Sequence, residues 1–176
     1  MKTREKGFTL TEMLVSLSIA TMIGASALLV IFQVSHGTES NNDRMTALRQ
    51  VENAGYWIGR DIQTARGVST DNLTSPDFLV LNWTEWDTEG EPIYYSSKYF
   101  FGDMNNNIGK LKRSLWSSNG ISEQTLIAQH IFFDSDNETY TSWVSYDSPI
   151  LSLKLTSSYD GILESREYKI IRRTNY

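Results

Sequence analysis

The sequence predicts an α+β protein in which one long N-terminal helix packs on an antiparallel β-sheet. Residues 8–67 consist of an apolar segment followed by an amphipathic segment, and the pattern of each is typical of a helix. Short strand-like runs separated by turn residues occupy the rest of the 176 residues. A helix followed by consecutive strands is the element order of α+β domains. The length suits one domain with an appendage.

The N-terminal segment has the length and composition of a membrane-spanning helix. No charged residue occurs from Met13 to Phe32, and residues 1–7 carry three basic side chains against one acidic side chain. Twenty helical residues rise about 30 Å, which is the thickness of the hydrocarbon core of a bilayer. Basic residues ahead of an apolar run predict that the N-terminus stays in the cytoplasm. We therefore expect a single-pass protein of the inner (cytoplasmic) membrane with its C-terminal domain outside the cytoplasm.

A cleaved secretory signal explains this segment less well than an anchor does. Residues 25–27, Ala-Ser-Ala, have the small-x-small pattern of a signal cleavage site, but the apolar run continues directly after them to Phe32. Glu12 lies inside the apolar segment that begins at Phe8, where a carboxylate is costly. Lys6 lies six residues away and does not share its helix face, so Glu12 has no partner cation nearby on its own helix.

A motif at the start of the apolar run, KGFTLTE at residues 6–12, resembles the prepilin motif of type IV pilins and type II secretion pseudopilins. The resemblance implies a pilin-like fold and cleavage by a prepilin peptidase between Gly7 and Phe8, followed by N-methylation of Phe8. It also implies that Glu12, the fifth residue of the mature chain, pairs with the terminal amine of a neighbouring subunit during assembly. Such a pair is worth more in an apolar helical bundle than in water.

Residues 37–67 predict an amphipathic continuation of the helix. Its apolar residues recur at spacings of three or four, which places them on one face; they are Met45, Leu48, Val51, Ile58, Ile62 and Ala65, with Gly55 in the same series. Charged residues, Asp61 among them, fall mostly elsewhere. Gly37 and the polar residues 39–43 predict a flexible joint ahead of this part, and Gly67 is the predicted helix stop.

Seven strands are predicted in the β-rich region 68–176. They are residues 78–84, 93–101, 109–116, 124–133, 139–146, 150–156 and 165–172. Turns are predicted at Asn119-Gly120, Asp160-Gly161 and residues 105–107. The chain thus divides into a leader (1–7), an apolar helix (8–36), an amphipathic helix (37–67) and a β-rich region (68–176). We expect residues 37–176 to form one extracytoplasmic domain that folds without the apolar helix.

No enzymatic site and no cofactor are expected. The sequence has no cysteine and only two histidines, which excludes thiol catalysis and His-rich metal sites within this chain. The oxygen ligands from Asp134 to Glu138 could hold calcium or form an exposed acidic turn. His130 and Asp134 could suggest a catalytic pair, but no nucleophile motif accompanies them. The net charge of −5 disfavours nucleic-acid binding, and the basic cluster of Lys110, Lys112 and Arg113 is predicted to be a solvated strand face.

The resemblance therefore implies a structural subunit, a minor pilin or pseudopilin. Residues 48–51 and 59–65 resemble the J branch of this family, also called the PilW or GspJ type. The implied partners are prepilin peptidase, other pilin or pseudopilin subunits, the inner-membrane assembly machinery and the lipid bilayer, and no nucleic acid is expected. The competing interpretation is a membrane-anchored extracytoplasmic binding domain, an adhesin or DNA receptor, outside any filament. The sequence leaves open whether the filament is a type IV pilus, a secretion pseudopilus or part of a DNA-uptake system.

Overall fold

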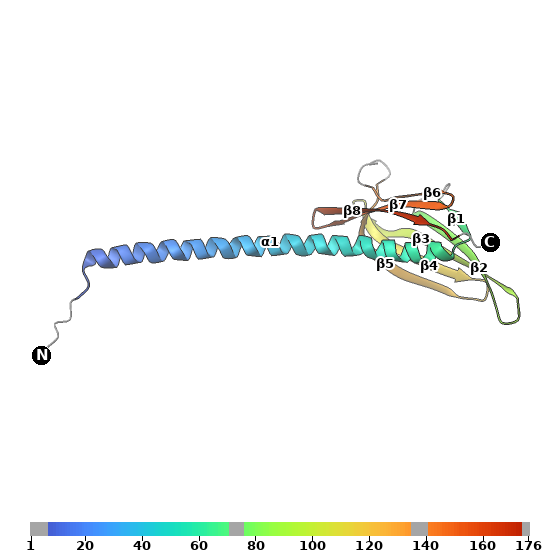
Figure 1. Cartoon of the computed structure of the whole chain (residues 1–176), viewed down its shortest axis with the longest axis horizontal. Helices are drawn as coiled ribbons and strands as arrows, with labels where there is room; N and C mark the ends of the chain where they lie inside the picture. Colours follow the sequence, from blue (N-terminus) through green and yellow to red (C-terminus); the bar gives the residue numbers. More distant parts are fainter. Residues whose placement is uncertain (1–6, 71–75, 135–140, 174–176) are drawn as a thin grey trace. The chain divides into compact units, whose positions relative to one another are not determined.

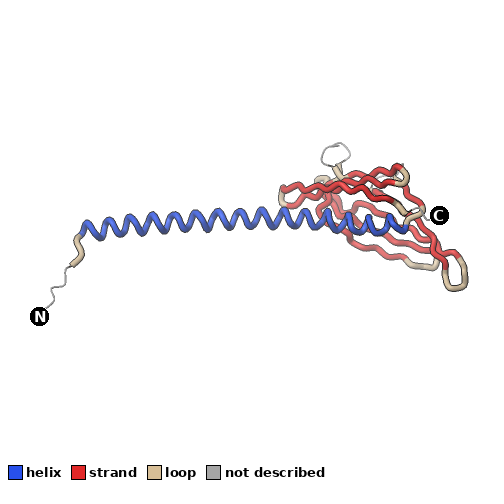
Figure 2. Tube along the Cα trace, in the orientation of Figure 1, coloured by secondary structure: helices blue, strands red, loops and turns tan. Residues whose placement is uncertain are grey.

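The computed structural model describes residues 7–70, 76–134 and 141–173, and the chain divides into two compact units between Asn42 and Asp43. Helix α1 runs without interruption from Leu10 to Thr64, so the first unit contains its beginning and the second unit its end (Figure 2). The joint predicted around Gly37 does not interrupt this helix. No proline lies in α1, and one glycine costs a helix only about 1 kcal/mol.

The part of α1 in the first unit is uncovered. Every side chain from Leu10 to Asn42 is exposed, and the most apolar 18-residue window has a mean hydropathy of 2.3. Five hydroxyl groups of this part donate to backbone carbonyls three or four residues earlier. The hydroxyls are those of Ser16, Ser18, Thr21, Ser26 and Thr38. These local bonds satisfy the hydroxyls without any neighbour. By length and composition, α1 is suited to cross a membrane.

The second unit joins the end of α1 to an antiparallel sheet, which in the described residues has eight strands. They are β1 (Gly67–Ser69), β2 (Asp77–Trp86), β3 (Pro92–Asn105), β4 (Ile108–Ser117), β5 (Ser122–Phe132), β6 (Trp143–Asp147), β7 (Ile150–Tyr159) and β8 (Ile162–Ile171). The order is β1-β2-β3-β4-β5-β7-β6, and β8 pairs with β7. The α+β class is confirmed, and each predicted strand has a counterpart. Strand β1 was missed because three residues show no alternation.

The sheet curls around the end of α1 at a weak seam. Strands β5 and β7 share a single residue pair, Ile131 with Ser157, and His130 just before it has a φ of 58°. A left-handed residue bends a strand away from the regular ladder. Figure 1 shows the result: from Asp43 onward, α1 lies between β8 on one side and β4 and β5 on the other. Hydrogen bonds from Asp61 also join this part of α1 to β3 and β4.

The core lies between α1 and the sheet. Its fully buried side chains include Val51, Ala54, Ile58 and Ile62 of α1, and Leu79, Leu81, Tyr99, Leu111, Ile131, Leu151, Leu153 and Leu155 of the strands. The predicted stripe is confirmed from Val51 to Ala65. Met45 is an error of that prediction, because it is 48% exposed, and the buried positions of the helix begin only at Ala47.

The helix ends before the predicted stop. Thr64 is its last residue, and Gly67 opens β1 instead of capping the helix. The Arg66 N–H donates to the Asn82 carbonyl at 2.8 Å, and Gly67 pairs with Asn82, so pairing with β2 redirects the chain. The three predicted turns are confirmed, with left-handed residues at Asn106-Asn107, Gly120 and Asp160-Gly161.

Gly55 allows β8 to approach the helix closely. A Cβ at this position would lie 2.4 Å from Cζ of Tyr168, and the Tyr168 hydroxyl donates to the Val51 carbonyl at 3.2 Å. Burial raises the pKa of Tyr168 above its ordinary value. At Gly59, by contrast, a Cβ would make an ordinary contact of 3.6 Å with Cδ1 of Ile170.

Replacing Gly55 by alanine should therefore destabilise the second unit. Overpacking against Tyr168 costs about 1–3 kcal/mol, which outweighs the gain of up to about 1 kcal/mol from the better helix former. Gly59→Ala, on the same helix without the clash, should leave the stability unchanged or raise it. Urea unfolding of a chain that begins at Glu39 measures both variants. Equal stability of the two would show that Tyr168 moves aside without cost.

Candidate functional site

The predicted cleavage and assembly residues lie together at the start of α1. Gly7, Phe8 and Thr9 precede the helix, which begins at Leu10. Phe8 is 82% exposed, and no atom of the described residues lies within 4 Å of a Cβ built on Gly7. The Gly7–Phe8 peptide bond is therefore outside the helix and accessible, as proteolytic processing requires.

Glu12 and Thr9 form a capping box. The Thr9 N–H and hydroxyl donate to Oε2 of Glu12 at 2.9 and 2.8 Å, and the Glu12 N–H donates back to Oγ1 of Thr9 at 3.3 Å. This exchange satisfies N–H groups that the first turn of a helix leaves unpaired. The carboxylate of Glu12 thus has a hydrogen-bond partner in its own chain, Thr9. This partner was not predicted. The Thr-x-x-Glu spacing is the signal that predicts it.

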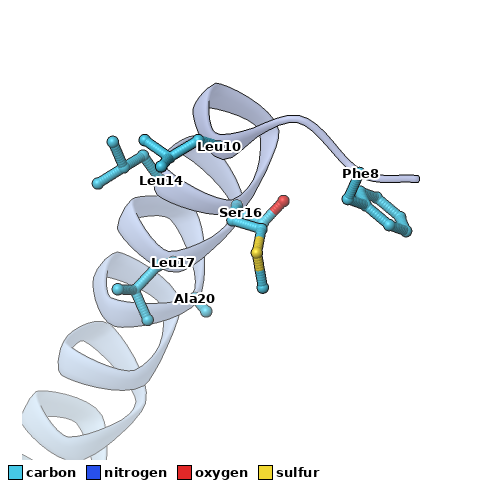
Figure 3. Close-up of a pocket in the computed structure, with 7 residues that line it drawn as sticks. Phe8, Leu10, Leu14, Ser16, Leu17 and Ala20 are labelled. Atoms are coloured by element: carbon cyan, nitrogen blue, oxygen red, sulfur yellow. The ribbon is translucent and has the colours of Figure 1, made fainter.

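Apolar side chains around this motif surround an open hollow of about 780 Å³. Figure 3 shows Phe8 apart from the first turns, while Leu10, Leu14 and Leu17 follow one another along the helix. These residues are exposed, and no described side chain of the first unit buries them. Apolar surface of this extent is stable only against lipid or another apolar surface.

The comparison with protein families concerns this same segment. A family model described as the prokaryotic N-terminal methylation motif matches residues 2–28. The chain carries this methylation motif. The match supports a type IV pilin-like subunit of the kind that prepilin peptidase processes, and that family is structural rather than enzymatic. No curated protein and no solved structure matches the chain significantly.

A second cluster of charged residues, not predicted from the sequence, lies inside the second unit. Asp61 of α1 is 4% exposed and Arg113 of β4 is 6% exposed. Oδ2 of Asp61 accepts three hydrogen bonds, from Nε of Arg113 at 2.6 Å, the Tyr99 hydroxyl at 2.8 Å and the Ser97 hydroxyl at 3.0 Å. One carboxylate oxygen therefore connects the helix to β3 and β4.

The electrostatics of this cluster favour a positioning role. Burial raises the pKa of Tyr99 well above its ordinary value, and the negative charge of Asp61 and the hydrogen bond to it raise that pKa further. Burial opposes the Arg113 cation, but the hydrogen bond and charge of Asp61 outweigh it, so the pKa of Arg113 is raised as well. Trp57 adds a cation–π contact, 5.6 Å from Cζ of Arg113. Because both pKa values are raised, Tyr99 and Arg113 stay protonated near neutral pH and act as hydrogen-bond donors rather than as acid–base groups.

The buried cluster corrects two predictions. Asp61 is predicted to lie outside the apolar face of the helix, but in the structure it is buried against the sheet. The basic cluster expected on one solvated face is divided: Arg113 is buried, whereas Lys110 and Lys112 pair with Asp103 at 3.1 and 3.2 Å. Their hydrogen bonds lower the pKa of Asp103. Adjacent residues of a strand point to opposite faces of the sheet, so this rule would have predicted Lys112 and Arg113 on different faces.

The remaining candidates lack a site in the described residues. The His130 ring packs edge-to-face on Tyr159 at 5.0 Å between centroids, which supports a packing role. The described residues contain no group of three side chains suited to a metal ion. The calcium candidate from Asp134 to Glu138 lies outside the described residues, apart from Asp134 itself.

Removing the buried carboxylate should destabilise the protein far more than removing an exposed one. Asp61→Ala leaves the Arg113 cation buried without its partner, which costs about 3–5 kcal/mol. The matched control is Glu52→Ala, which breaks the exposed ion pair between Glu52 of α1 and Arg166 of β8 at 2.9 Å and costs about 1 kcal/mol or less. Urea midpoints measure both variants. A similar loss in the two would contradict the role given to Asp61.

Proposed function

We propose that this chain is a minor pilin or pseudopilin, a structural subunit of a type IV pilus or a type II secretion pseudopilus. The methylation motif at residues 2–28 carries the proposal. Within this motif we assign cleavage to the Gly7–Phe8 bond, methylation to Phe8 and assembly to Glu12. The uncovered apolar part of α1 and the α+β fold of the second unit suit such a subunit. The resemblance of residues 48–51 and 59–65 supports the J branch.

The proposed topology follows from the leader and the apolar run. The basic residues of 1–7 stay in the cytoplasm, α1 spans the inner membrane, and residues 37–176 form the extracytoplasmic domain. In the membrane, the partners are prepilin peptidase, the assembly machinery and lipid. In the filament, the apolar surfaces of other subunits replace the lipid around α1.

The capping box suggests how Glu12 takes part in assembly. Both Thr9 donors bind Oε2 of Glu12, and no described residue donates to Oε1. Oε1 can therefore accept the methylated amine of a neighbouring subunit while Oε2 keeps the helix capped. An ion pair in this apolar setting replaces two separately buried charges, each of which is costly. A subunit at the very tip has no neighbour above it, so the presence of Glu12 supports a place beneath another minor subunit.

The competing function is a membrane-anchored binding domain that stays outside any filament. A polar and aromatic hollow on the sheet, lined by Tyr94 and Trp116 among others, favours some binding role for the second unit. The two functions differ in their demand on Glu12. A retained anchor needs its apolar helix but not the carboxylate, whereas a filament subunit needs both.

Processing should produce a mature chain that begins at methylated Phe8. Mass spectrometry of the protein purified from its native membrane should show the loss of residues 1–7 and the gain of one methyl group. Gly7→Ala keeps the charge and the apolar run but alters the residue before the cut, and it should accumulate as the full-length chain. A mature start at Leu28, or an intact Met1 in the unaltered protein, would refute the proposal.

Glu12 should be required for assembly and dispensable for cleavage. Glu12→Gln keeps a side chain that can cap at this position but removes the charge, so cleavage should proceed while incorporation into sheared filaments or the tip complex falls about tenfold or more. Thr9→Ala is the reciprocal control, because it removes the hydroxyl from the capping box, keeps the Thr9 backbone N–H bond and keeps the charge of Glu12. It should retain most of the incorporation. Immunoblots of both fractions measure the two steps. Normal incorporation of Glu12→Gln would favour the retained anchor.

A further inference from the structure

The outer face of β2, β3 and β4 exposes three large aromatic side chains. Trp86, Tyr94 and Trp116 are 63%, 56% and 52% exposed. Tyr99 and Arg113 point toward the helix, and strand residues alternate, so Tyr94 and Trp116 point to the opposite face. Exposed aromatic rings that gather on one sheet face mark a binding surface more often than rings exposed singly.

A hollow of about 290 Å³ lies on this sheet between Tyr94 and Trp116. Small-molecule sites begin at about 300 Å³, so the hollow has the size of a small site or of one subsite. Its polar lining comes from three parts of the second unit: Arg66 between α1 and β1, Asn82 and Thr84 of β2, and Ser96 of β3. Trp83 of β2 and Tyr95 of β3 also line it and stack on each other at 5.3 Å between ring centroids, which adds a side-chain contact between the two paired strands.

The polar side chains of the hollow can still form hydrogen bonds with a ligand. The side chains of Arg66, Asn82, Thr84 and Ser96 make no hydrogen bond or ion pair within the described part of the chain, and the same holds for the Tyr94 hydroxyl and the Trp116 indole N–H. Together they offer guanidinium, amide and hydroxyl groups, which both donate and accept. Flat rings beside such groups are the usual composition of a site that orients a small polar ligand.

We propose that this hollow binds a neutral saccharide. The apolar C–H face of a pyranose ring packs on a flat aromatic ring, and Tyr94 and Trp116 provide two such rings. The hydroxyl groups around the edge of the sugar bind Asn82, Thr84 and Ser96. Trp86 lies two residues beyond Thr84 on the same face, so it extends the aromatic surface for a further sugar unit. This binding activity goes beyond the proposed structural role.

The charges around the hollow favour a neutral ligand over a nucleic acid. The lysines of the outer face are paired, Lys98 with Asp77 at 2.7 Å, and Lys110 and Lys112 with Asp103. Arg66 is the only charged side chain in the described lining, whereas single-stranded nucleic acid requires a groove of cations that follows its backbone. The described lining also contains no aliphatic side chain, which makes it unlike the apolar centre of a protein–protein interface.

The test uses the full-length chain in a zwitterionic detergent without sugar headgroups, with its tryptophan indole nitrogens labelled for NMR. Chitohexaose, cellohexaose and maltoheptaose serve as neutral probes, so N-acetylated and plain glucose chains are compared. We expect at least one probe to shift the Trp116 resonance saturably, and Trp116→Ala to weaken its binding about tenfold or more. Trp116→Phe keeps a flat ring and should retain more affinity. Trp143→Ala, which removes an exposed ring of β6 outside the hollow, should change nothing.

Three outcomes would overturn the proposal. The first is that the unaltered chain, folded as its dispersed NMR spectrum shows, binds none of the three oligosaccharides saturably. The second is a sugar that binds equally well to Trp116→Ala, because the site would then lie elsewhere. The third is that no sugar binds while the chain either binds a thymidine oligonucleotide tightly or self-associates in a way that Trp116→Ala abolishes. These results would assign the surface to nucleic acid or to another protein chain.

Discussion

The carboxylate of Asp61 determines how the helix and the sheet of the second unit fit together. Three donors from β3 and β4 meet one oxygen atom, and all of them are shielded from water. A slip of the helix by one turn, about 5.4 Å, would leave Arg113 and Tyr99 buried without an acceptor. Apolar packing alone tolerates small slips, because leucine, isoleucine and valine fit one another in many ways. The buried ion pair therefore specifies the register that the apolar core stabilises.

The opposite side of the helix is fixed by a steric constraint. Tyr168 of β8 lies where a side chain at position 55 would be, and its hydroxyl binds the helix backbone at Val51. The weak seam between β5 and β7 allows β8 to reach this place, because a single residue pair constrains the sheet there. The outer face of β2 to β4 points away from the helix and does not contribute to this enclosure. Its exposed aromatic rings can therefore serve binding.

The two units suit the different demands of the proposed filament subunit, which would begin in a membrane. The helix of the first unit keeps its apolar side chains exposed and its hydroxyls bonded to its own backbone, so it can pass from lipid to a bundle of similar helices. Glu12 is its one carboxylate from Leu10 to Phe32, and the capping box keeps it in place. The second unit has its own core, formed by buried side chains of α1 and of the strands.

The sequence by itself determined the features that depend on neighbours along the chain. Helical periodicity, strand alternation and turn residues predicted the α+β class, most strand positions and the three turns. The roles of Gly7, Phe8 and Glu12 come from the local motif and stay predictions. Thr9 was also within reach, because a capping box has a fixed spacing. Only the tertiary structure decided the burial of Asp61 and Arg113, the closeness of Tyr168 to Gly55 and the hollow between Tyr94 and Trp116. The hydrogen bonds that join Asp61 and Tyr168 to their partners link residues 36 to 117 apart in the chain, and no local pattern specifies which distant strand a side chain faces.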